Sequence, residues 1–198
     1  MKLISLLTDF GMKDGYVGVM KGVIWGIAPG IQIADITHDI EPQNILEGAL
    51  ALKRAVPYFP DGTIHLAVVD PGVGTARRAM AARIGKHFLV GPDNGLGTFL
   101  FDWAQARGES VHIVELDRPE YWLAEVGSSF HGRDMFAPAA AHLANGVPLS
   151  ELGTDIGDPV RLKMPQPRRT PTGWSGEIIH IDHFGNVESN ISAECLKN

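Results

Sequence analysis

Short apolar runs alternate with segments of helical period along the first part of the chain. Three runs of about strand length end in acids, glycines or polar residues, as buried strands often do; they are residues 3–8, 31–37 and 63–70. Between them, apolar residues recur at spacings of three and four, which predicts helices within residues 14–28 and 44–56. An alternation of strands and helices is typical of parallel β–α–β units. We therefore expect an α/β fold, with a mostly parallel sheet flanked by helices.

The middle of the chain continues this pattern and adds a hairpin. Two apolar runs between residues 79 and 95 meet at Gly85 and Lys86, which indicates a tight turn. A strand is expected at residues 110–117, and helices are expected at residues 97–108 and 133–146. The second of these helices stops at Gly146, and its interior Pro138 belongs in the first turn or produces a kink.

The composition changes after residue 157. Residues 158–173 hold four of the thirteen prolines and show no helical period, which is typical of an extended linker. Beyond it, residues 176–192 alternate and turn at Phe184–Gly185–Asn186, as a β-hairpin does. A lone hairpin cannot bury its apolar side chains, so it needs another surface. The expected organisation is an α/β N-terminal domain at 1–157, a linker at 158–172 and the start of a β domain at 173–198.

The composition limits the classes of partner that the protein is expected to bind and the cellular compartment in which we expect it. The 198 residues carry a net charge of −6 with acids and bases interspersed, and they contain no basic stripe that would bind nucleic acid. The single Cys195 excludes a disulfide within the chain. No apolar run reaches membrane-spanning length, and the N-terminal run is too short for a signal peptide. We expect a cytoplasmic protein that binds neither nucleic acid nor a membrane.

Three acids lie at or just beyond the ends of predicted strands and could carry chemistry. In an open parallel sheet, ligands bind outside the carboxyl ends of the strands, where Asp9, Asp14 and Asp70 are expected. Glycines beside Asp9 and Asp70 would let a ligand approach the backbone closely. The alternative is that each acid caps the following helix. Asp14 is the best candidate for a cap, because a helical pattern begins directly after it.

Residues 70–78, DPGVGTARR, join the third strand to two arginines. The segment lacks the Lys-Ser/Thr of a phosphate-binding P-loop, and no G-x-G-x-x-G follows a strand, so a dinucleotide site is not expected. Arg77 and Arg78 could form an anion-binding nest, or they could pair with acids on a surface turn. His131 precedes a predicted helix, where it could act as a general base or have no catalytic task.

The segment HIDHFGN offers too few ligands for a metal. In a strand, His180 and Asp182 share a face while His183 points away, so at most two side chains converge. Zinc takes three or four protein ligands. We expect neither a metal nor a cofactor.

Four motifs, taken together, resemble one protein family. They are TDFGMKDGYVG at 8–18, VVDPGVGTARR at 68–78, FHGRDMFAP at 130–138 followed by AAAHLANG, and IDHFGNVESNI at 181–191. The chain resembles the S-adenosyl-L-methionine (SAM) hydroxide adenosyltransferases, formerly a family of unknown function, which are related to the bacterial fluorinase and chlorinase. The motifs occur in the right order along essentially the whole chain, so the resemblance is far more specific than any single motif.

The resemblance implies a reaction and an assembly. Members of this family convert SAM and water to adenosine and L-methionine, with SAM as substrate and no cofactor, by attack on C5′ of the ribose. The resemblance also implies a β-barrel-like C-terminal domain and a homotrimer, with active sites between the N-terminal domain of one subunit and the C-terminal domain of its neighbour. Family members continue beyond the length of this chain, so we expect an incomplete barrel and weak or no hydrolase activity.

Carried over position by position, the resemblance assigns Asp70, Arg77 and His131 to a hydrolytic triad. The substrate-binding positions are Asp9 for the ribose hydroxyls, Asp14 and Asp182 for the methionine amino group, and Phe184 and Asn186 for the adenine.

The related halogenases differ from this chain in the triad. They have an uncharged residue in place of Asp70 and no counterpart of His131, and the fluorinase has a halide-contacting serine in place of Gly132. A carboxylate would repel a halide but would accept a hydrogen bond from water, which favours the hydrolase. Two alternatives are a halide-using synthase that makes 5′-halo-5′-deoxyadenosine, and a module that binds adenosine or SAM without catalysis.

Overall fold

The first part of the chain folds as the expected β–α–β–α–β series. A computed structural model describes residues 3–197 of the chain. The elements of this series are β1 (Leu3–Thr8), α1 (Tyr16–Ile27), β2 (Gln32–Thr37), α2 (Ile45–Ala55) and β3 (Ile64–Val68). β1 pairs in parallel with both β2 and β3, which confirms the parallel units predicted from the alternating pattern.

Seven strands form one sheet in the order β2-β1-β3-β5-β4-β6-β7. The additional strands are β4 (Ala79–Ile84), β5 (His87–Pro92), β6 (Val111–Glu115) and β7 (Thr154–Asp155). β5 is parallel to β3, whereas β4 is antiparallel to both of its neighbours. The tight turn at Gly85 and Lys86 requires this reversal, because so short a connection can join only antiparallel strands.

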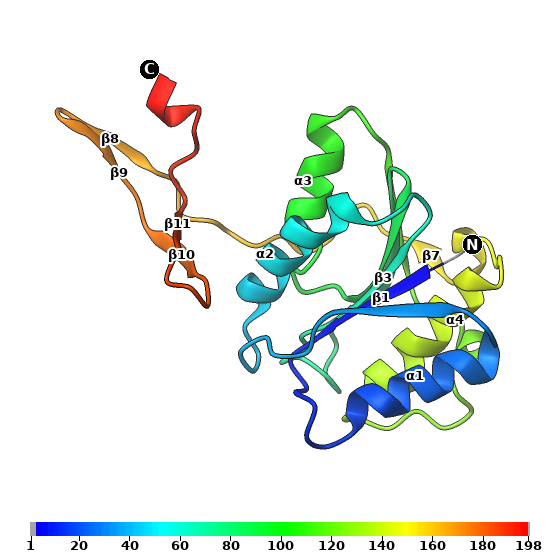
Figure 1. Cartoon of the computed structure of the whole chain (residues 1–198). Helices are drawn as coiled ribbons and strands as arrows, with labels where there is room; N and C mark the ends of the chain where they lie inside the picture. The colour runs from blue at the N-terminus through cyan, green and yellow to red at the C-terminus, as the bar shows by residue number, and fades with distance from the viewer. Residues whose placement is uncertain (1–2, 198) are drawn as a thin grey trace. The chain divides into compact units, whose positions relative to one another are not determined.

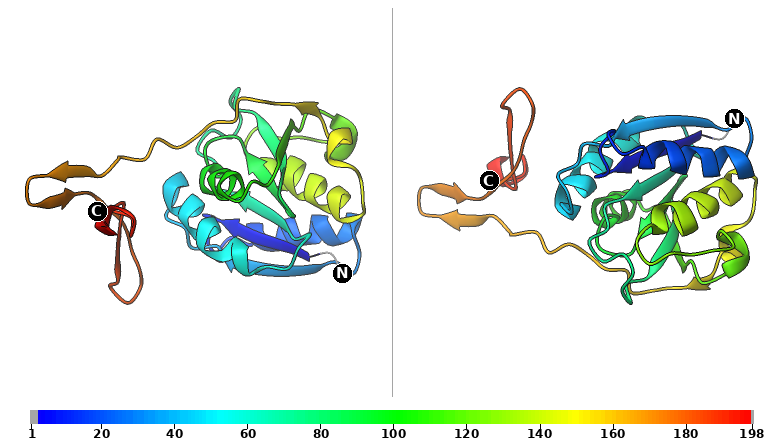
Figure 2. Two further views of the ribbon diagram at one scale, coloured as in Figure 1. Left: turned by 90° about the horizontal axis from the view of Figure 1, so that it is seen from above. Right: turned by 90° about the horizontal axis from the view of Figure 1, so that it is seen from below.

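Helices cover both faces of the sheet, as Figures 1 and 2 show. α1 and α4 (Ala137–Ala144) pack on one face, where Met20, Ile24 and Leu66 are fully buried. α2 and α3 (Thr98–Ala106) pack on the other face, against Ala67 and Leu89. Successive residues of β3 point into the two cores in turn, so this strand is buried along its whole length. The mostly parallel α/β fold is therefore confirmed.

Two local expectations are corrected at helix starts. The helix expected from residue 133 begins as a π-helix, Gly132–Phe136, and Pro138 then lies in the first turn of α4. Proline has no N–H and its ring crowds the preceding turn, so the widened turn before it accommodates the proline without breaking the helix. Asp14 does not cap α1: the cap is Gly15, with a φ of 75° and no side-chain hydrogen bond.

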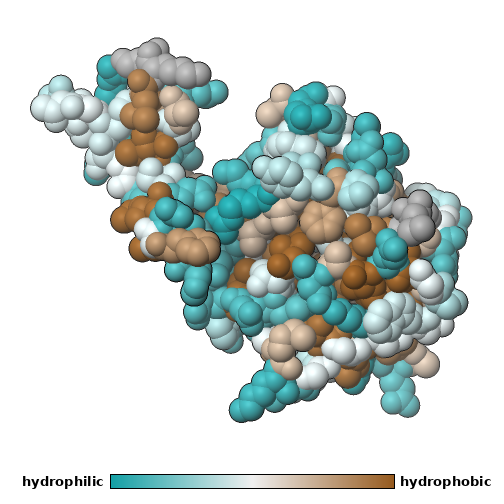
Figure 3. Space-filling model, viewed as in Figure 1, coloured by the Kyte–Doolittle hydropathy of each residue, from teal (hydrophilic) through white to brown (hydrophobic). Residues whose placement is uncertain are grey.

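The residues that follow Arg161 form a second compact unit. It contains two antiparallel hairpins, β8 (Arg168–Thr170) with β9 (Gly173–Ser175) and β10 (Ile178–Ile181) with β11 (Val187–Ser189). β8 occupies a stretch that we expected to be part of the linker. Apolar side chains of this unit are exposed, and some are visible as brown atoms in Figure 3; they are Ile178, Ile181, Phe184, Val187 and Leu196.

No helix within residues 3–197 is long and apolar enough to cross a membrane.

A buried polar chain crosses the sheet from β1 to β5. His65 Nδ1 lies 2.6 Å from Ser5 Oγ, and His65 Nε2 lies 3.2 Å from His87 Nδ1. All three residues are buried, and His65 is fully enclosed. Burial, and after it the proximity of His87, lowers the pKa of His65 to about 3. The folded protein therefore holds this imidazole neutral over a pH range in which the unfolded chain binds a proton.

We predict that acid weakens the fold through His65. Below pH 6.5 the unfolded chain is protonated at this position and the folded chain is not, so stability falls as the pH drops toward 3. The loss from His65 at pH 5 is about 2 kcal/mol, from 1.36 kcal/mol per pKa unit. Urea unfolding of His65→Gln from pH 7 to pH 5 should show a shallower fall than the wild type. His112→Gln, at a surface histidine, is the control, and equal slopes in all three proteins would contradict the prediction.

Candidate active site

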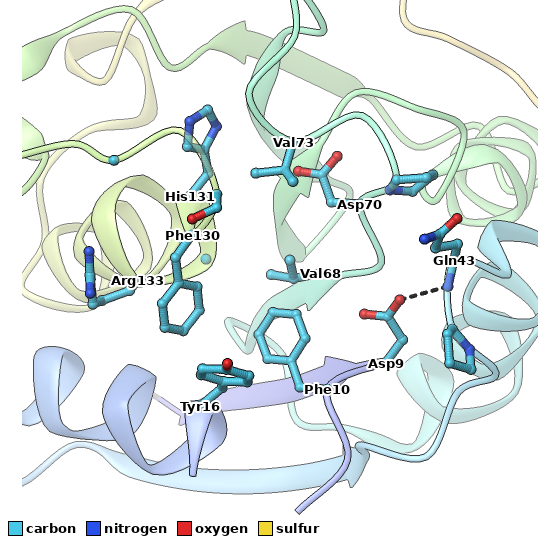
Figure 4. A pocket seen from close by; sticks show the side chains of 15 residues that line it. Asp9, Phe10, Tyr16, Gln43, Val68, Asp70, Val73, Phe130, His131 and Arg133 are labelled. Atoms are coloured by element: carbon cyan, nitrogen blue, oxygen red, sulfur yellow. Dashed lines mark hydrogen bonds between the residues drawn. The ribbon is translucent and has the colours of Figure 1, made fainter. Parts of the chain in front are cut away.

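A cavity of about 610 Å³ opens at the carboxyl ends of β1 and β3, where Asp9 and Asp70 follow the strands. This is the edge at which parallel sheets bind ligands, because the loops that leave the strands meet there. Residues 127–133, which lead into the π-helix, supply another wall. Figure 4 shows the side chains that converge from these segments.

Asp70 and Arg77 form a closely paired group at the end of β3. Two glycines in the intervening turn allow the chain to reverse, and Gly74 has a φ of 75°. Arg77 Nε lies 2.9 Å from each carboxylate oxygen of Asp70, and Arg77 Nη2 also donates to Asp70 Oδ2. Both side chains are largely buried, with exposed fractions of 5% for Asp70 and 10% for Arg77. Such charge-assisted, multiply bonded pairs hold a carboxylate in one orientation.

His131 joins this pair through the same guanidinium. Arg77 Nη2 lies 3.0 Å from His131 Nδ1. Because a guanidinium only donates, Nδ1 must be unprotonated, and the neutral ring carries its proton on Nε2. Burial, and after it the positive charge of Arg77, lowers the pKa of His131 below its usual range. The structure thus brings together the three residues assigned to the triad, with Arg77 in the middle.

A buried acid that the sequence analysis missed positions the loop before His131. Asp134 is fully buried in the π-helix and accepts hydrogen bonds from Gly127 N at 2.9 Å and from Arg133 Nε at 2.5 Å. Its backbone carbonyl accepts from Leu123 N at 2.9 Å. These bonds tie residues 123–127 to the helix that follows the triad histidine. The sequence shows an acid after an arginine here, but no local pattern reveals that its partners lie in the preceding loop.

Asp9 faces the cavity and is held by backbone. Asp9 Oδ2 accepts a hydrogen bond from Gln43 N at 2.8 Å, and Figure 4 marks this bond. Gln43 has a φ of 67°, the one positive value for a non-glycine residue in the described part of the chain. A bulky residue rarely adopts this conformation, so other contacts must hold it there. Asp9 therefore does not cap the following helix, and its Oδ1 has no hydrogen-bond partner within residues 3–197.

Three aromatic rings form a cluster in another wall of the cavity. The ring centroids of Phe10, Tyr16 and Phe130 lie 5.3 to 6.2 Å apart, and all three pairs are arranged edge to face. A Cβ atom at Gly132 would lie 3.3 Å from Phe130 Cε2 and 3.4 Å from Phe10 Cζ. The absence of a side chain at Gly132 therefore lets two of the rings pack closely. No local sequence pattern marks this wall, because the rings come from segments more than a hundred residues apart.

Arg78 has a different task from Arg77. Its Nε lies 3.0 Å from Asp93 Oδ2, and its two Nη atoms donate to a side-chain oxygen and the carbonyl of Asp158 at 2.8 Å. The two arginines thus pair with carboxylates, as in the second of the two readings above, and they do not form an anion nest. Arg78 links Asp158 to Asp93, whereas Arg77 bonds the two cavity-lining residues Asp70 and His131.

The remaining predicted binding residues are Asp14, beside α1, and three residues of the second unit, Asp182, Phe184 and Asn186. Asp14 is exposed and does not line the cavity. Asp182 belongs to the second unit, where its carboxylate accepts from Phe184 N, Asn186 N and Asn186 Nδ2 at 2.7 to 2.9 Å. The bond from the Asn186 side chain, followed by the backbone bond, holds the pKa of Asp182 below its usual range. These bonds shape a turn that leaves Phe184 88% exposed.

No group of three or more His, Cys, Asp or Glu side chains within residues 3–197 converges as a metal site requires.

The segment that builds this cavity matches a known family. A family model described as the SAM hydroxide adenosyltransferase N-terminal domain matches residues 4–153, which contain Asp9, Asp70 and His131. The chain belongs to the SAM hydroxide adenosyltransferase family. The resemblance carried by the four motifs is thereby confirmed.

Relatives within this family and beyond it are similar over most of the chain. The (R)-S-adenosyl-L-methionine hydrolase of Salinispora tropica is 45% identical over 196 residues, which cover 98% of this chain and 74% of that protein. The fluorinase of an Actinoplanes species is 32% identical over 216 residues and covers 96% of this chain and 71% of its own. The crystal structure of an uncharacterized conserved protein from Thermotoga maritima has a TM-score of 0.88 at 40% identity, covering 98% of this chain and 73% of that one.

We predict that the turn between Asp70 and Arg77 tolerates no side chain at Gly74. A Cβ there would lie 2.3 Å from the carbonyl oxygen of Ser128, in the loop that leads to His131. Gly108→Ala is the matched control, because Gly108 has a φ of 68° and open space around it. We expect the control to lose about 1–2 kcal/mol for its backbone conformation alone. Gly74→Ala should lose clearly more in urea unfolding, and equal losses would show that the close contact is unimportant.

Proposed function

We propose that this chain hydrolyses SAM to adenosine and L-methionine, by in-line attack of water or hydroxide on C5′ of the ribose. The observation that carries the proposal is the connected group of Asp70, Arg77 and His131 at the wall of the cavity. Membership of the SAM hydroxide adenosyltransferase family and the name of the Salinispora relative support the same reaction.

The reaction needs a positioned nucleophile more than an acid. The sulfonium of SAM leaves as a neutral thioether, so the leaving group needs no proton. In the balanced step, a water oxygen bonds to C5′, the C5′–S bond breaks with its electron pair on sulfur, and one proton is released. Asp70 is suited to accept a hydrogen bond from that water, since Arg77 fixes its orientation. Positioning of this kind can contribute about 7–11 kcal/mol to catalysis.

We assign to His131 the acceptance of the proton that the attacking water releases. Its lowered pKa leaves the imidazole neutral near pH 7, and Nδ1 is its unprotonated atom. In the absence of substrate this atom accepts from Arg77. When Nδ1 takes the proton of the water, its hydrogen bond from Arg77 breaks, while Arg77 keeps its hydrogen bonds to Asp70 and holds the carboxylate in place. The negative charge of Asp70 favours the new imidazolium and the positive charge of Arg77 opposes it, so the proton is bound only weakly and is readily passed on to solvent.

Charge and shape favour water over a halide as the nucleophile. A carboxylate in the wall that faces the nucleophile repels an anion but binds a water hydrogen. Gly132 offers no hydroxyl to replace the hydration shell of a halide. A module that only binds SAM would need no buried acid–arginine–histidine group, whose desolvation weighs against the stability of the fold.

The substrate-binding residues and the assembly are also part of the proposal. Asp9 Oδ1 is free to accept the ribose hydroxyls, while Asp14 and Asp182 are assigned to the methionine amino group and Phe184 and Asn186 to the adenine. We propose a homotrimer in which the second unit of one subunit completes the cavity of its neighbour. The exposed apolar side chains of that unit support self-association, because they need a surface to cover them.

We predict that incubation with SAM in ¹⁸O-labelled water places the label in the 5′-hydroxyl of adenosine, because attack occurs at C5′. The products are identified by mass spectrometry, with and without added fluoride or chloride. Appearance of 5′-halo-5′-deoxyadenosine would support the synthase instead. Release of methylthioadenosine with labelled homoserine would place the attack on the methionine carbons and overturn the mechanism.

We predict that Asp70→Asn and His131→Ala each lower kcat by about 100-fold or more, in line with the loss of an acid–base or positioning group. Adenosine binding should change little, because Asp9 and the adenine contacts are untouched. Asp155→Asn, which removes a surface partner of His112, is the control. A variant that retains nearly full turnover would remove its residue from the catalytic group.

A further inference from the structure

The aromatic wall lies across the cavity from the catalytic group. In Figure 4 the carboxylate of Asp70 and the ring of His131 lie on one side, and the rings of Phe10, Tyr16 and Phe130 gather on the other. Val68, at the end of β3, lies between the two sides. The rings therefore face the space in which a ligand would be attacked from the direction of Asp70.

In-line displacement determines what occupies the space beside the rings. The nucleophile and the leaving group must lie on opposite sides of the carbon that is attacked. If the water binds at Asp70, the sulfonium points away from Asp70 and toward the aromatic wall. The position of Asp9 agrees with this placement. Asp9 is assigned to the ribose hydroxyls, and Phe10 of the aromatic wall directly follows it in the chain. In SAM, the sulfur is only three bonds from C3′ of the ribose.

The wall is electrostatically suited to a cation. Within residues 3–197, the one cation that lies over a ring of the cluster is Arg133, whose guanidinium carbon is 5.2 Å from the centroid of Phe130. Arg133 is paired with the fully buried Asp134, so its charge is balanced and does not repel a second cation strongly. No cation lies over Phe10 or Tyr16 in the part of the chain that the structure describes, and Tyr16 is 48% exposed at the wall.

We propose that Phe10, Tyr16 and Phe130 recognise the positive charge of the SAM sulfonium and so determine specificity for the cation over the neutral thioether S-adenosyl-L-homocysteine. This inference rests on the proposed function. The faces of aromatic rings carry partial negative charge and attract cations, most strongly where water is excluded. S-adenosyl-L-homocysteine has the same adenosyl and amino acid ends but lacks the methyl group and the charge.

The proposal has a kinetic signature. The sulfonium loses its charge as the C5′–S bond breaks, so the rings stabilise bound substrate at least as strongly as the transition state. Removal of a ring should therefore raise KM while kcat stays the same or rises. A residue of the catalytic group gives the opposite result, a large fall in kcat.

The decisive experiment changes the charge on a ring face without changing its shape. Phe10 is replaced by phenylalanine with one, two or three ring fluorines, and Kd is measured for SAM, S-adenosyl-L-homocysteine and adenosine. An Asp70→Asn background, expected to slow turnover by about 100-fold or more, keeps the ligand intact over a short measurement. We expect the Kd of SAM to rise stepwise, to about three- to tenfold at full substitution, while the Kd values of the two neutral ligands stay constant. Tyr16→Leu should give a similar loss, selective for SAM.

Each result bears on the proposal. Tyr58→Leu, at an aromatic residue that is 89% exposed and does not line the cavity, should leave all three Kd values unchanged. Parallel losses for SAM and S-adenosyl-L-homocysteine would overturn the proposal and assign the rings a purely steric role. Parallel losses for adenosine would show that the rings stack on the base. A wild-type chain that does not prefer SAM to the neutral thioether would also overturn it. Because these are equilibrium measurements, absence of hydrolysis would refute the proposed function without affecting this test.

Discussion

One guanidinium group organises the catalytic end of this fold. Arg77 donates to Asp70, seven residues before it, and to His131, 54 residues after it, so a single side chain joins the end of β3 to the loop before the π-helix. Arginine is suited to this position because it is always charged and its donors form a fixed fork. A lysine could neutralise Asp70. Its single ammonium lacks the planar set of donors of a guanidinium, so it would not fix the carboxylate and the imidazole relative to each other.

This arrangement depends on places where the backbone can approach other atoms closely. Gly74 passes within contact distance of the Ser128 carbonyl, and Gly132 leaves room for Phe10 and Phe130. Asp134 then ties the loop before His131 to the π-helix that follows it. The π-helix itself precedes Pro138, where the chain cannot donate a backbone hydrogen bond. Several local irregularities of the fold therefore lie around the cavity.

Much of the scaffold could be predicted because its signals are local. The period of apolar residues indicated β1 to β3 and their helices, and the position of Asp9 and Asp70 after strands indicated the edge that carries the cavity. The triad itself came from the family resemblance, since no local pattern connects Arg77 with His131. Long-range partners escaped prediction for the same reason: the bond from Gln43 to Asp9 and the loop contacts of Asp134 appear only in three dimensions. The alternative that Asp14 caps α1 is wrong, because Gly15 in a left-handed conformation starts the helix without a side-chain bond.

The distribution of charge in the cavity explains how one site could bind a cation and release neutral products. Asp70 is balanced by Arg77, and Asp134 is balanced by Arg133, whereas Asp9 has no cationic partner within residues 3–197. The unliganded cavity therefore has an excess of negative charge and an aromatic wall, and both attract a cation. Cleavage of the C5′–S bond removes the positive charge from the ligand, since adenosine is neutral and methionine is a zwitterion. The same two features that favour entry of the substrate then contribute little to retaining the products, so one site can perform both steps.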